Sequence, residues 1–310
     1  MGKIKKWLEK IYLLSILMYS KIYYFHIEVT VYKIIQNVKI SQNVGKAVIE
    51  APYIAQHRKA GQFVIVIVDE VGERIPLTIA DSNRDNGTIT LYYQIVGTST
   101  HKLSLKKEGE ELYDVAGPLG HPTDIHNYGT VVCVGGGIGI AAVYPIAVAM
   151  KDAGNYCINI IGARNKDLLI LEEELKIKSD EIIVTTDDGS YGIKGFVTDE
   201  LKKILDSKKV GIVVAVGPVP MMKAVSDLTR QYNVKTLVSL NSIMVDGTGM
   251  CGGCRVTVDG RKQFTCVDGP EFDAHMVDFD ELMKRLNTYK DQEKVSFEKH
   301  TCKLEQYHGR

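Results

Sequence analysis

Short runs of alternating apolar and polar residues fill the chain from Val31 to about Asp124. The runs are separated by turns rich in Gly, Asn and Asp, a spacing typical of a small antiparallel barrel. We expect a short helix at residues 101–105, a turn at residues 117–120, and strands at residues 38–40, 46–50, 63–68, 74–79 and 88–96. Tyr92 and Tyr93 are neighbours in the last strand, so only one of them can face the barrel interior.

The alternation of apolar and polar residues ends near Tyr128, and longer apolar runs follow. A continuous apolar run at residues 130–134 is followed by a glycine loop at 135–139 and a helical pattern at 140–151. Further buried strands are expected at residues 157–161, 181–185, 211–216 and 236–240, alternating with helices at 168–176, 197–206 and 219–232. Buried strands that alternate with helices predict a parallel, doubly wound sheet.

The glycine loop is the first candidate binding site. A loop between a buried strand and a helix is the usual place for a dinucleotide phosphate. The match to G-x-G-x-x-G is imperfect, because Ile140 stands at the third glycine position. The loop consists of Gly135, Gly136, Gly137, Ile138 and Gly139.

Ligands of such sheets lie beyond the carboxyl ends of the strands, where we expect Asp187, Asp188, Gly217 and Pro218. The two aspartates would repel a 2′-phosphate and therefore favour NADH over NADPH. The alternative is that they form an acidic, solvated turn.

The most specific chemical pattern is D-x4-C-x2-C-x11-C, formed by Asp246, Cys251, Cys254 and Cys266. Plant-type [2Fe–2S] sites have C-x4-C-x2-C and a distant fourth Cys, so Asp246 occupies the first ligand position here. The many glycines allow the loop to fold tightly. The spacing favours an iron–sulfur cluster; a zinc site completed by a carboxylate or His275 is the alternative.

The residues that follow the first three predicted ligands also have recognisable patterns. Residues 256–265 predict a hairpin with its turn at Asp259 and Gly260, which would return Cys266 to the other thiols. Residues 279–289 predict an amphipathic helix, and residues 290–310 a mobile tail or partner contact. Cys302 lies in that tail and is expected to be incidental.

Residues 1–30 differ in pattern from the rest of the chain, because four lysines precede an apolar run at residues 11–19. The run is shorter than the roughly 20 residues that span a bilayer. We expect an extension outside the functional fold; a basic amphipathic surface anchor is the alternative.

Composition narrows the class of protein. The 310 residues are 45% hydrophobic and 25% charged with zero formal net charge, which is ordinary for globular domains and gives no basic footprint for nucleic acid. The six cysteines do not form a secreted disulfide pattern, and Cys133 and Cys157 fall in apolar strands. A cytoplasmic protein with an available cluster-assembly system is expected, and association with a membrane is not.

With these motifs, the chain resembles the small FAD/[2Fe–2S] subunit of NADH-dependent reduced ferredoxin:NADP oxidoreductases, also described as a sulfide dehydrogenase subunit. It is also similar to the electron-transfer subunit of dihydroorotate dehydrogenase. The resemblance covers residues 31–280. It rests on the glycine loop, the cluster loop, Gly217-Pro218 and the segments at 76–78, 96–100, 117–120 and 187–192.

The resemblance implies a ferredoxin-reductase-like fold: an FAD-binding barrel (31–125), an NAD-binding α/β domain (126–240), a [2Fe–2S] segment (241–280) and a helix and tail (281–310). It places the flavin ring and phosphate at Arg74, Pro76, Leu77 and Thr78, and the FAD pyrophosphate at Val96, Gly97, Ser99 and Thr100. The family has its arginine three residues before Thr78, where this chain has Ile75, so Arg74 stands one position before the family's arginine. Asp246 matches the ferredoxin:NADP oxidoreductase subunit rather than the dihydroorotate subunit.

The implied function is transfer of electrons between NAD(H), FAD and a [2Fe–2S] cluster, in an NAD(P)H-dependent flavin oxidoreductase subunit. No acid–base catalytic residue is needed for hydride transfer. The implied partner is a larger, glutamate-synthase-like subunit that carries flavin and [4Fe–4S] clusters, where electrons bifurcate, with ferredoxin as an indirect partner. The alternatives are a dihydroorotate dehydrogenase subunit and, from another class, a zinc-stabilised nucleotide-binding regulatory module.

Overall fold

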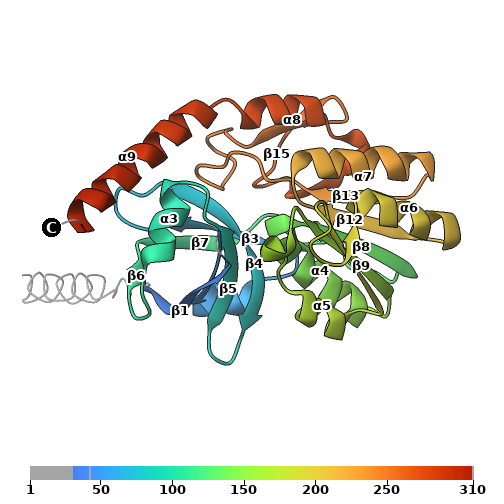
Figure 1. The fold of residues 1–310 in the computed structure, drawn as a ribbon, viewed down its shortest axis with the longest axis horizontal. Coiled ribbons are helices and arrows are strands. Elements are labelled where there is room, and N and C mark those ends of the chain that lie inside the picture. The colour runs from blue at the N-terminus through green and yellow to red at the C-terminus, as the bar shows by residue number, and fades with distance from the viewer. Residues whose placement is uncertain (1–30, 42, 309–310) are drawn as a thin grey trace, which may run out of the picture. The chain divides into compact units, whose positions relative to one another are not determined.

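The computed structural model describes residues 31–41 and 43–308, with two seven-stranded sheets and one separate hairpin (Figure 1). Both interpretations of residues 1–30 fall outside this part of the chain. Within the described residues, no helix combines the length and the apolar composition needed to cross a membrane.

The first sheet is antiparallel, in the order β6-β1-β2-β5-β4-β3-β7, and curls into a nearly closed barrel. Its interior is filled by apolar side chains that alternate along the strands, including Ile49, Val64 and Leu91. Tyr93 is among them, whereas Tyr92 points outward and packs against the second core. The barrel is therefore confirmed, but its interior is a packed core. The strands are β1 (Tyr32–Ser41), β2 (Val44–Glu50), β3 (Phe63–Ile67), β4 (Arg74–Asn83), β5 (Thr88–Gln94), β6 (Glu111–Leu112) and β7 (Asp114–Leu119).

Two helices accompany the barrel. The helix α2 (Pro52–His57) was not expected from the sequence, since its six residues are too few for a periodic signal. The helix α3 (Thr98–Leu105) was expected to begin at His101 but begins three residues earlier. The expected turn at residues 117–120 is also wrong, because most of it continues strand β7 beside β3.

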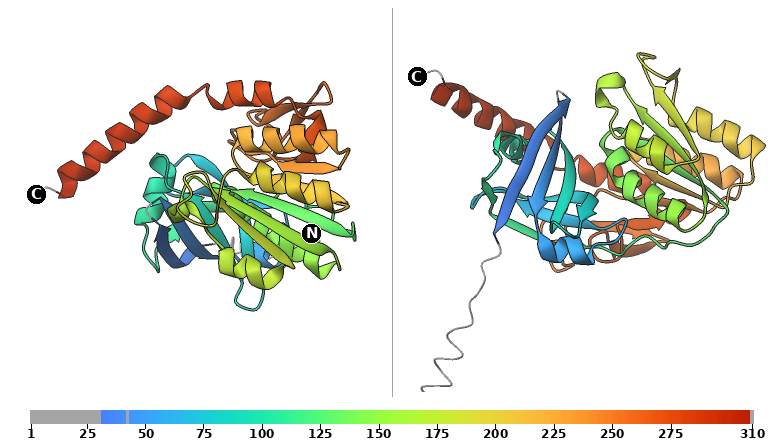
Figure 2. Two further views of the ribbon diagram at one scale, coloured as in Figure 1. Left: turned by 45° about the vertical axis from the view of Figure 1, so that its right-hand side comes forward. Right: turned by 90° about the horizontal axis from the view of Figure 1, so that it is seen from below.

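The second sheet has the order β11-β10-β9-β8-β12-β13-β16 and is parallel except for β16. Its central strands are buried on both faces, which explains their continuous apolar runs. Helices α4 and α5 cover one face, and α6 and α7 cover the other (Figures 1 and 2). The strands are β8 (Thr130–Gly136), β9 (Tyr156–Ala163), β10 (Glu181–Thr186), β11 (Ile193–Lys194), β12 (Ile212–Val216), β13 (Thr236–Ser239) and β16 (Glu271–Asp273).

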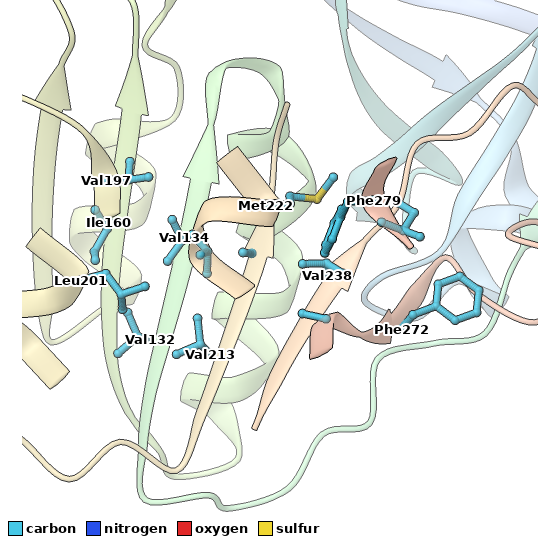
Figure 3. Close-up of a cluster of buried hydrophobic side chains, with 14 of the residues drawn as sticks. Val132, Val134, Ile160, Val197, Leu201, Val213, Met222, Val238, Phe272 and Phe279 are labelled. Atoms are coloured by element: carbon cyan, nitrogen blue, oxygen red, sulfur yellow. The ribbon is translucent and has the colours of Figure 1, made fainter. Parts of the chain in front are cut away.

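The helices follow the expected alternation with one displacement. Helix α5 (Glu172–Lys178) begins after a 3₁₀ turn at Lys166–Leu168, four residues later than the expected start at Leu168. The others are α4 (Ile140–Asp152), α6 (Val197–Ser207) and α7 (Val219–Gln231). Figure 3 shows the core under α6 and α7, where Leu201 and Met222 meet the sheet residues Val134 and Val213. Cys133 and Cys157 are fully buried, as predicted.

The C-terminal segment forms a hairpin and two helices. The hairpin of β14 (Arg255–Val258) and β15 (Arg261–Phe264) turns at Asp259 and Gly260, both at positive φ, as the sequence predicted. Helix α8 (Phe279–Leu286) comes next, and Phe279 and Phe272 extend the core in Figure 3. The expected mobile tail is instead helix α9 (Lys290–His308), which continues from α8 to the barrel (Figures 1 and 2).

Candidate functional site

The glycine loop lies at the carboxyl end of β8, with a 3₁₀ turn at Gly137–Gly139 leading into α4. Other groups approach closely at two glycines, and at Gly139 the neighbour is backbone that cannot move aside. A Cβ on Gly139 would lie 2.4 Å from the carbonyl oxygen of Val216, and one on Gly136 would lie 2.4 Å from Met221 Sδ. The loop is therefore pressed against the end of β12, which brings it beside Gly217 as the sequence predicted.

Asp187 and Asp188 are exposed just past the end of β10. Asp188 accepts a hydrogen bond from the Ser190 backbone N–H at 2.8 Å, and its bonds to Ser190 lower the pKa of its carboxyl. The charge of Lys194 acts in the same direction. Lysine charge beside the acidic pair reduces the repulsion that a 2′-phosphate would meet here.

A shallow pocket adjoins this acidic loop and was not expected from the sequence. It has a volume of about 320 Å³ and lies between the start of α5 and Tyr191. The Lys166 ammonium lies 5.2 Å from the centre of the Tyr191 ring, and the Tyr191 hydroxyl donates to Glu172 at 3.0 Å. Leu171 has a φ of 58°, an uncommon left-handed conformation that sequence periodicity does not reveal.

The predicted flavin-ring motif lies on β4. Side chains alternate along a strand, so Pro76, Thr78 and Ala80 share the outer face while Leu77 joins the barrel core. Thr78 is opposite Phe63 of β3 in the register. Arg74 is exposed at the start of the strand, whereas Pro76 and Thr78 are half-buried.

The predicted pyrophosphate motif forms the first turn of α3. The Thr100 hydroxyl accepts hydrogen bonds from the backbone N–H groups of Val96 and Gly97, at 3.1 and 3.2 Å. The buried Ser99 hydroxyl donates to Glu73 at 2.9 Å. The first N–H groups of a helix have no partner within the helix, and a Cβ on Gly97 would meet no atom within 4 Å. The motif thus offers N–H donors and open space to an anion.

The cluster loop places two of the three predicted thiols together. Cys254 Sγ and Cys266 Sγ are 3.1 Å apart and buried, because the hairpin returns the chain as predicted. Two thiolates bound to one tetrahedral metal lie about 3.8 Å apart. The two sulfur atoms would therefore need to move apart only slightly to bind the same iron. Burial and the neighbouring Cys254 raise the pKa of the Cys266 thiol to about 12, so a metal is needed to deprotonate it at neutral pH.

The other two predicted ligands border this pair. Cys251 is exposed, and its Sγ accepts from the Gly253 backbone N–H at 3.4 Å. Asp246 accepts from the backbone N–H groups of Thr248 and Cys251, at 2.7 and 2.8 Å, and from the Thr248 hydroxyl. These bonds hold the pKa of Asp246 well below its usual range.

The donor types of the loop are those of iron–sulfur sites. In residues 31–41 and 43–308, no three His, Cys, Asp or Glu side chains are arranged to hold one metal ion. His275, the zinc alternative, has its Nε2 3.0 Å from the Thr229 hydroxyl on α7. Three thiols and a carboxylate on a glycine-rich loop match the donor chemistry of iron–sulfur ligation.

The cluster loop packs directly on the barrel. Cys254 and Cys266 share an apolar cluster with Phe63 and Ile65, which lie on the outer face of β3. Gly247 has a φ of 80°, and an added Cβ would approach Ile65 and Leu119 to within 3 Å, so its left-handed conformation and this contact both favour glycine.

The nucleotide side packs on the neighbouring strands. Ala80 of β4 and the outward-facing Tyr92 of β5 join Ile140 and Val143 of α4 in one core. The outer face of β4 that carries Thr78 is therefore flanked by the cluster loop on β3 and by the nucleotide-loop helix beside β5.

One further ionisable group was missed by sequence reasoning. Glu271, at the edge of the α/β sheet, accepts from the Thr123 hydroxyl at 2.5 Å. Burial raises the pKa of Glu271 to about 7. Its contact joins the cluster segment to the linker between the two sheets, and no local pattern around a single Glu indicates such a role.

Known families and proteins match the chain along most of its length. Residues 133–227 match the oxidoreductase NAD-binding domain, and residues 241–278 match the iron–sulfur cluster binding domain of dihydroorotate dehydrogenase B. A Thermotoga maritima homologue of the electron transfer subunit of dihydroorotate dehydrogenase B (NAD(+)) is 52% identical, over 86% of this chain and 94% of its own. The Fusobacterium nucleatum electron transfer subunit is 34% identical, over 79% and 96%.

Solved structures agree with this relationship. A chain of the NADH-dependent reduced ferredoxin-NADP oxidoreductase, studied for flavin-based electron bifurcation, superposes with a TM-score of 0.83 at 49% identity. The match covers 87% of this chain and 98% of that one. The cytochrome P450 reductase GcoB of Amycolatopsis has the same general fold, with a TM-score of 0.56, 19% identity and 65% of each chain covered.

Proposed function

The chain belongs to the family of dihydroorotate dehydrogenase B electron transfer subunits and their homologues, and from this membership we propose its function and site residues. It is an oxidoreductase subunit that passes electrons between NAD(H), FAD and a [2Fe–2S] cluster and on to a larger partner in a hetero-oligomer. When bound, the nicotinamide would supply a hydride to the flavin, and the cluster would supply single-electron transfer. The protein's own residues bind and orient these groups.

The observation that carries this proposal is the position of Thr78 on the outer face of β4. The neighbouring strand β3 contacts Cys254 and Cys266 through Phe63 and Ile65. Farther along β4, Ala80 packs against the helix that follows the nucleotide loop. A flavin held at Pro76, Leu77 and Thr78 would thus lie between its electron donor and its electron acceptor.

The nucleotide end is formed by backbone groups. Gly135 to Gly139 bring the start of α4 to the carboxyl end of the sheet, where helix N–H groups can receive a phosphate. Gly217 and Pro218 lie across from the glycine loop. The two segments are so close that a side chain at position 139 would not fit between them. Asp187 and Asp188 would accept hydrogen bonds from ribose hydroxyls of NADH.

The cluster end faces the partner. Cys254 and Cys266 are buried against the barrel, but Cys251 is exposed and its neighbour Met250 is 89% exposed. Electrons would enter through the buried side of the loop and leave through the exposed side. We assign the partner as a larger flavin and [4Fe–4S] subunit of the glutamate-synthase-like type, with ferredoxin further along the path.

A spectrum followed by rapid mixing tests the proposal. The purified chain should absorb as a flavin and an iron–sulfur protein, and NADH should bleach the flavin faster than NADPH does. In the matched variant Asp187→Ser/Asp188→Ser, the preference for NADH should decrease. A colourless, zinc-loaded protein would refute the redox function, while equal rates with both nucleotides would refute only the role of the aspartates.

A second candidate is the electron-transfer subunit of a dihydroorotate dehydrogenase, because the curated relatives carry that name. Asp246 at the first ligand position favours the first candidate. Co-purification decides between them: a glutamate-synthase-like subunit supports the first candidate, and a dihydroorotate-oxidising subunit supports the second.

A further inference from the structure

The middle of helix α9 packs against the helix that carries the proposed pyrophosphate motif. The His101 Nδ1 atom of α3 lies 3.1 Å from His300 Nε2 of α9, although the two residues are 199 positions apart. The Phe297 ring meets the His101 ring edge-on, with centroids 5.8 Å apart. The Thr98 and Ser296 hydroxyl oxygens are 3.4 Å apart. The contact therefore reaches the first turn of α3.

The other end of this helical segment is tied to the cluster loop. Helix α8 lies directly before α9 in the chain, and Arg285 in its last turn donates to the Gly253 carbonyl oxygen at 2.9 Å. Gly253 lies between Cys251 and Cys254. The C-terminal helices thus connect the support of the cluster to the support of the flavin phosphate, as the path from α8 to α3 in Figure 1 shows.

Between these two ends, α9 has little contact with the rest of the chain. Residues 290–296 are all exposed, whereas Phe297, His300 and Thr301 form a half-buried face at helical spacing. A helix segment that is exposed on all sides gains little from burial, so within residues 290–301 this one face holds α9 in place.

Helix α3 needs support of this kind. It has eight residues, and only Ser99 and Leu103 are buried. Its side-chain attachments to the barrel include the Ser99 hydrogen bond to Glu73 at 2.9 Å, the ion pair of Lys102 with Asp69 at 2.8 Å, and the bonds from Asn37 to the carbonyl oxygens at its C-terminal end. Short helices depend on tertiary contacts for their stability, so loss of the α9 contact should increase the motion of the pyrophosphate motif.

We propose that α9 is a strap that holds α3 over the FAD pyrophosphate and slows the release of FAD. The inference rests on the proposed placement of FAD at Gly97, Ser99 and Thr100. None of the strap residues belongs to that motif, so they act by positioning α3.

The test compares two double variants of the full chain. Phe297→Ala/His300→Ala removes the side chains that meet His101, and Glu298→Ala/Lys299→Ala changes two exposed residues of the same helix. FAD release is followed as the rise of flavin fluorescence after dilution, and iron content is measured in parallel. The first variant should release FAD about fivefold faster, the factor that corresponds to about 1 kcal/mol, and the second should match the parent.

The outcomes separate the strap from the function on which it rests. Equal release rates in the parent and in Phe297→Ala/His300→Ala, with FAD bound in both, would overturn the strap and leave the proposed function intact. A parent chain that binds no FAD would overturn both. Faster release in both double variants would also overturn the strap, because a general loss of helix α9 rather than its contact with α3 would then be responsible.

Discussion

Replacement of Gly139 by alanine tests the nucleotide site most directly. The residue has a φ of −61° and a ψ of −17°, which alanine adopts without strain, so the obstacle is space alone. An added Cβ would lie 2.4 Å from the Val216 carbonyl oxygen and 2.8 Å from Gly217 Cα. Both neighbours are backbone atoms of the sheet end and cannot rotate away.

The magnitude is set by this distance. Non-bonded contacts of carbon are normally about 3.5 Å, so the loop and the end of β12 must separate by about 1 Å. Overpacking of this kind costs about 1–3 kcal/mol. The displacement also moves the start of α4 away from Gly217, so we expect affinity for NADH to fall at least about tenfold, which corresponds to about 1.4 kcal/mol.

The assay is stopped-flow reduction of the flavin at increasing NADH concentrations, with FAD and iron contents as checks on the other sites. Gly154→Ala is the matched control, since it lies just past the other end of α4 and has a φ of 83°. It should lower stability through the left-handed conformation, by about 1–2 kcal/mol, without changing the NADH dependence. If Gly139→Ala has the NADH dependence of the parent, the nucleotide does not bind at this loop.

Three further outcomes are expected at the other sites. Asp246→Ala should lose iron from the cluster whereas Asp246→Cys should retain it with an altered reduction potential; full iron content and an unchanged EPR spectrum in the Ala variant would make Asp246 a turn residue only. Thr78→Val should weaken FAD binding by about 1–3 kcal/mol through loss of its hydroxyl, measured as FAD occupancy after dialysis, and unchanged occupancy would contradict this role. Burial, His300 and Lys39 lower the pKa of His101. Because His300 and Phe297 of α9 approach His101 only when α9 is docked, the docked state binds fewer protons than the undocked state and is favoured above the ordinary His pKa of about 6.5. FAD release should therefore accelerate as the pH falls below that value, and a rate independent of pH between about 5.5 and 8 would contradict the His101 contact.

Most strands and helices could be predicted from short stretches of the sequence alone. Alternating strands, continuous buried strands and the Asp259-Gly260 turn each have a strong short-range signal, and all three were found where expected. The glycine loop and the cysteine spacing likewise indicated their ligands, because phosphate and iron require particular backbone and donor chemistry. The errors include six-residue α2, the displaced starts of α3 and α5, the turn at residues 117–120 that belongs to β7, and the polar α9.

Which of these parts lie next to each other was decided only by the tertiary structure. Which strand of the barrel contacts Cys254 and Cys266 depends on sheet order and on the face to which Phe63 and Ile65 point. The contact between His101 and His300 joins segments 199 residues apart, and neither segment has a pattern that identifies the other. Periodicity and turn chemistry act over a few residues and so are visible in the sequence. Packing between distant segments depends on the complementarity of whole surfaces, which forms only when the chain is folded.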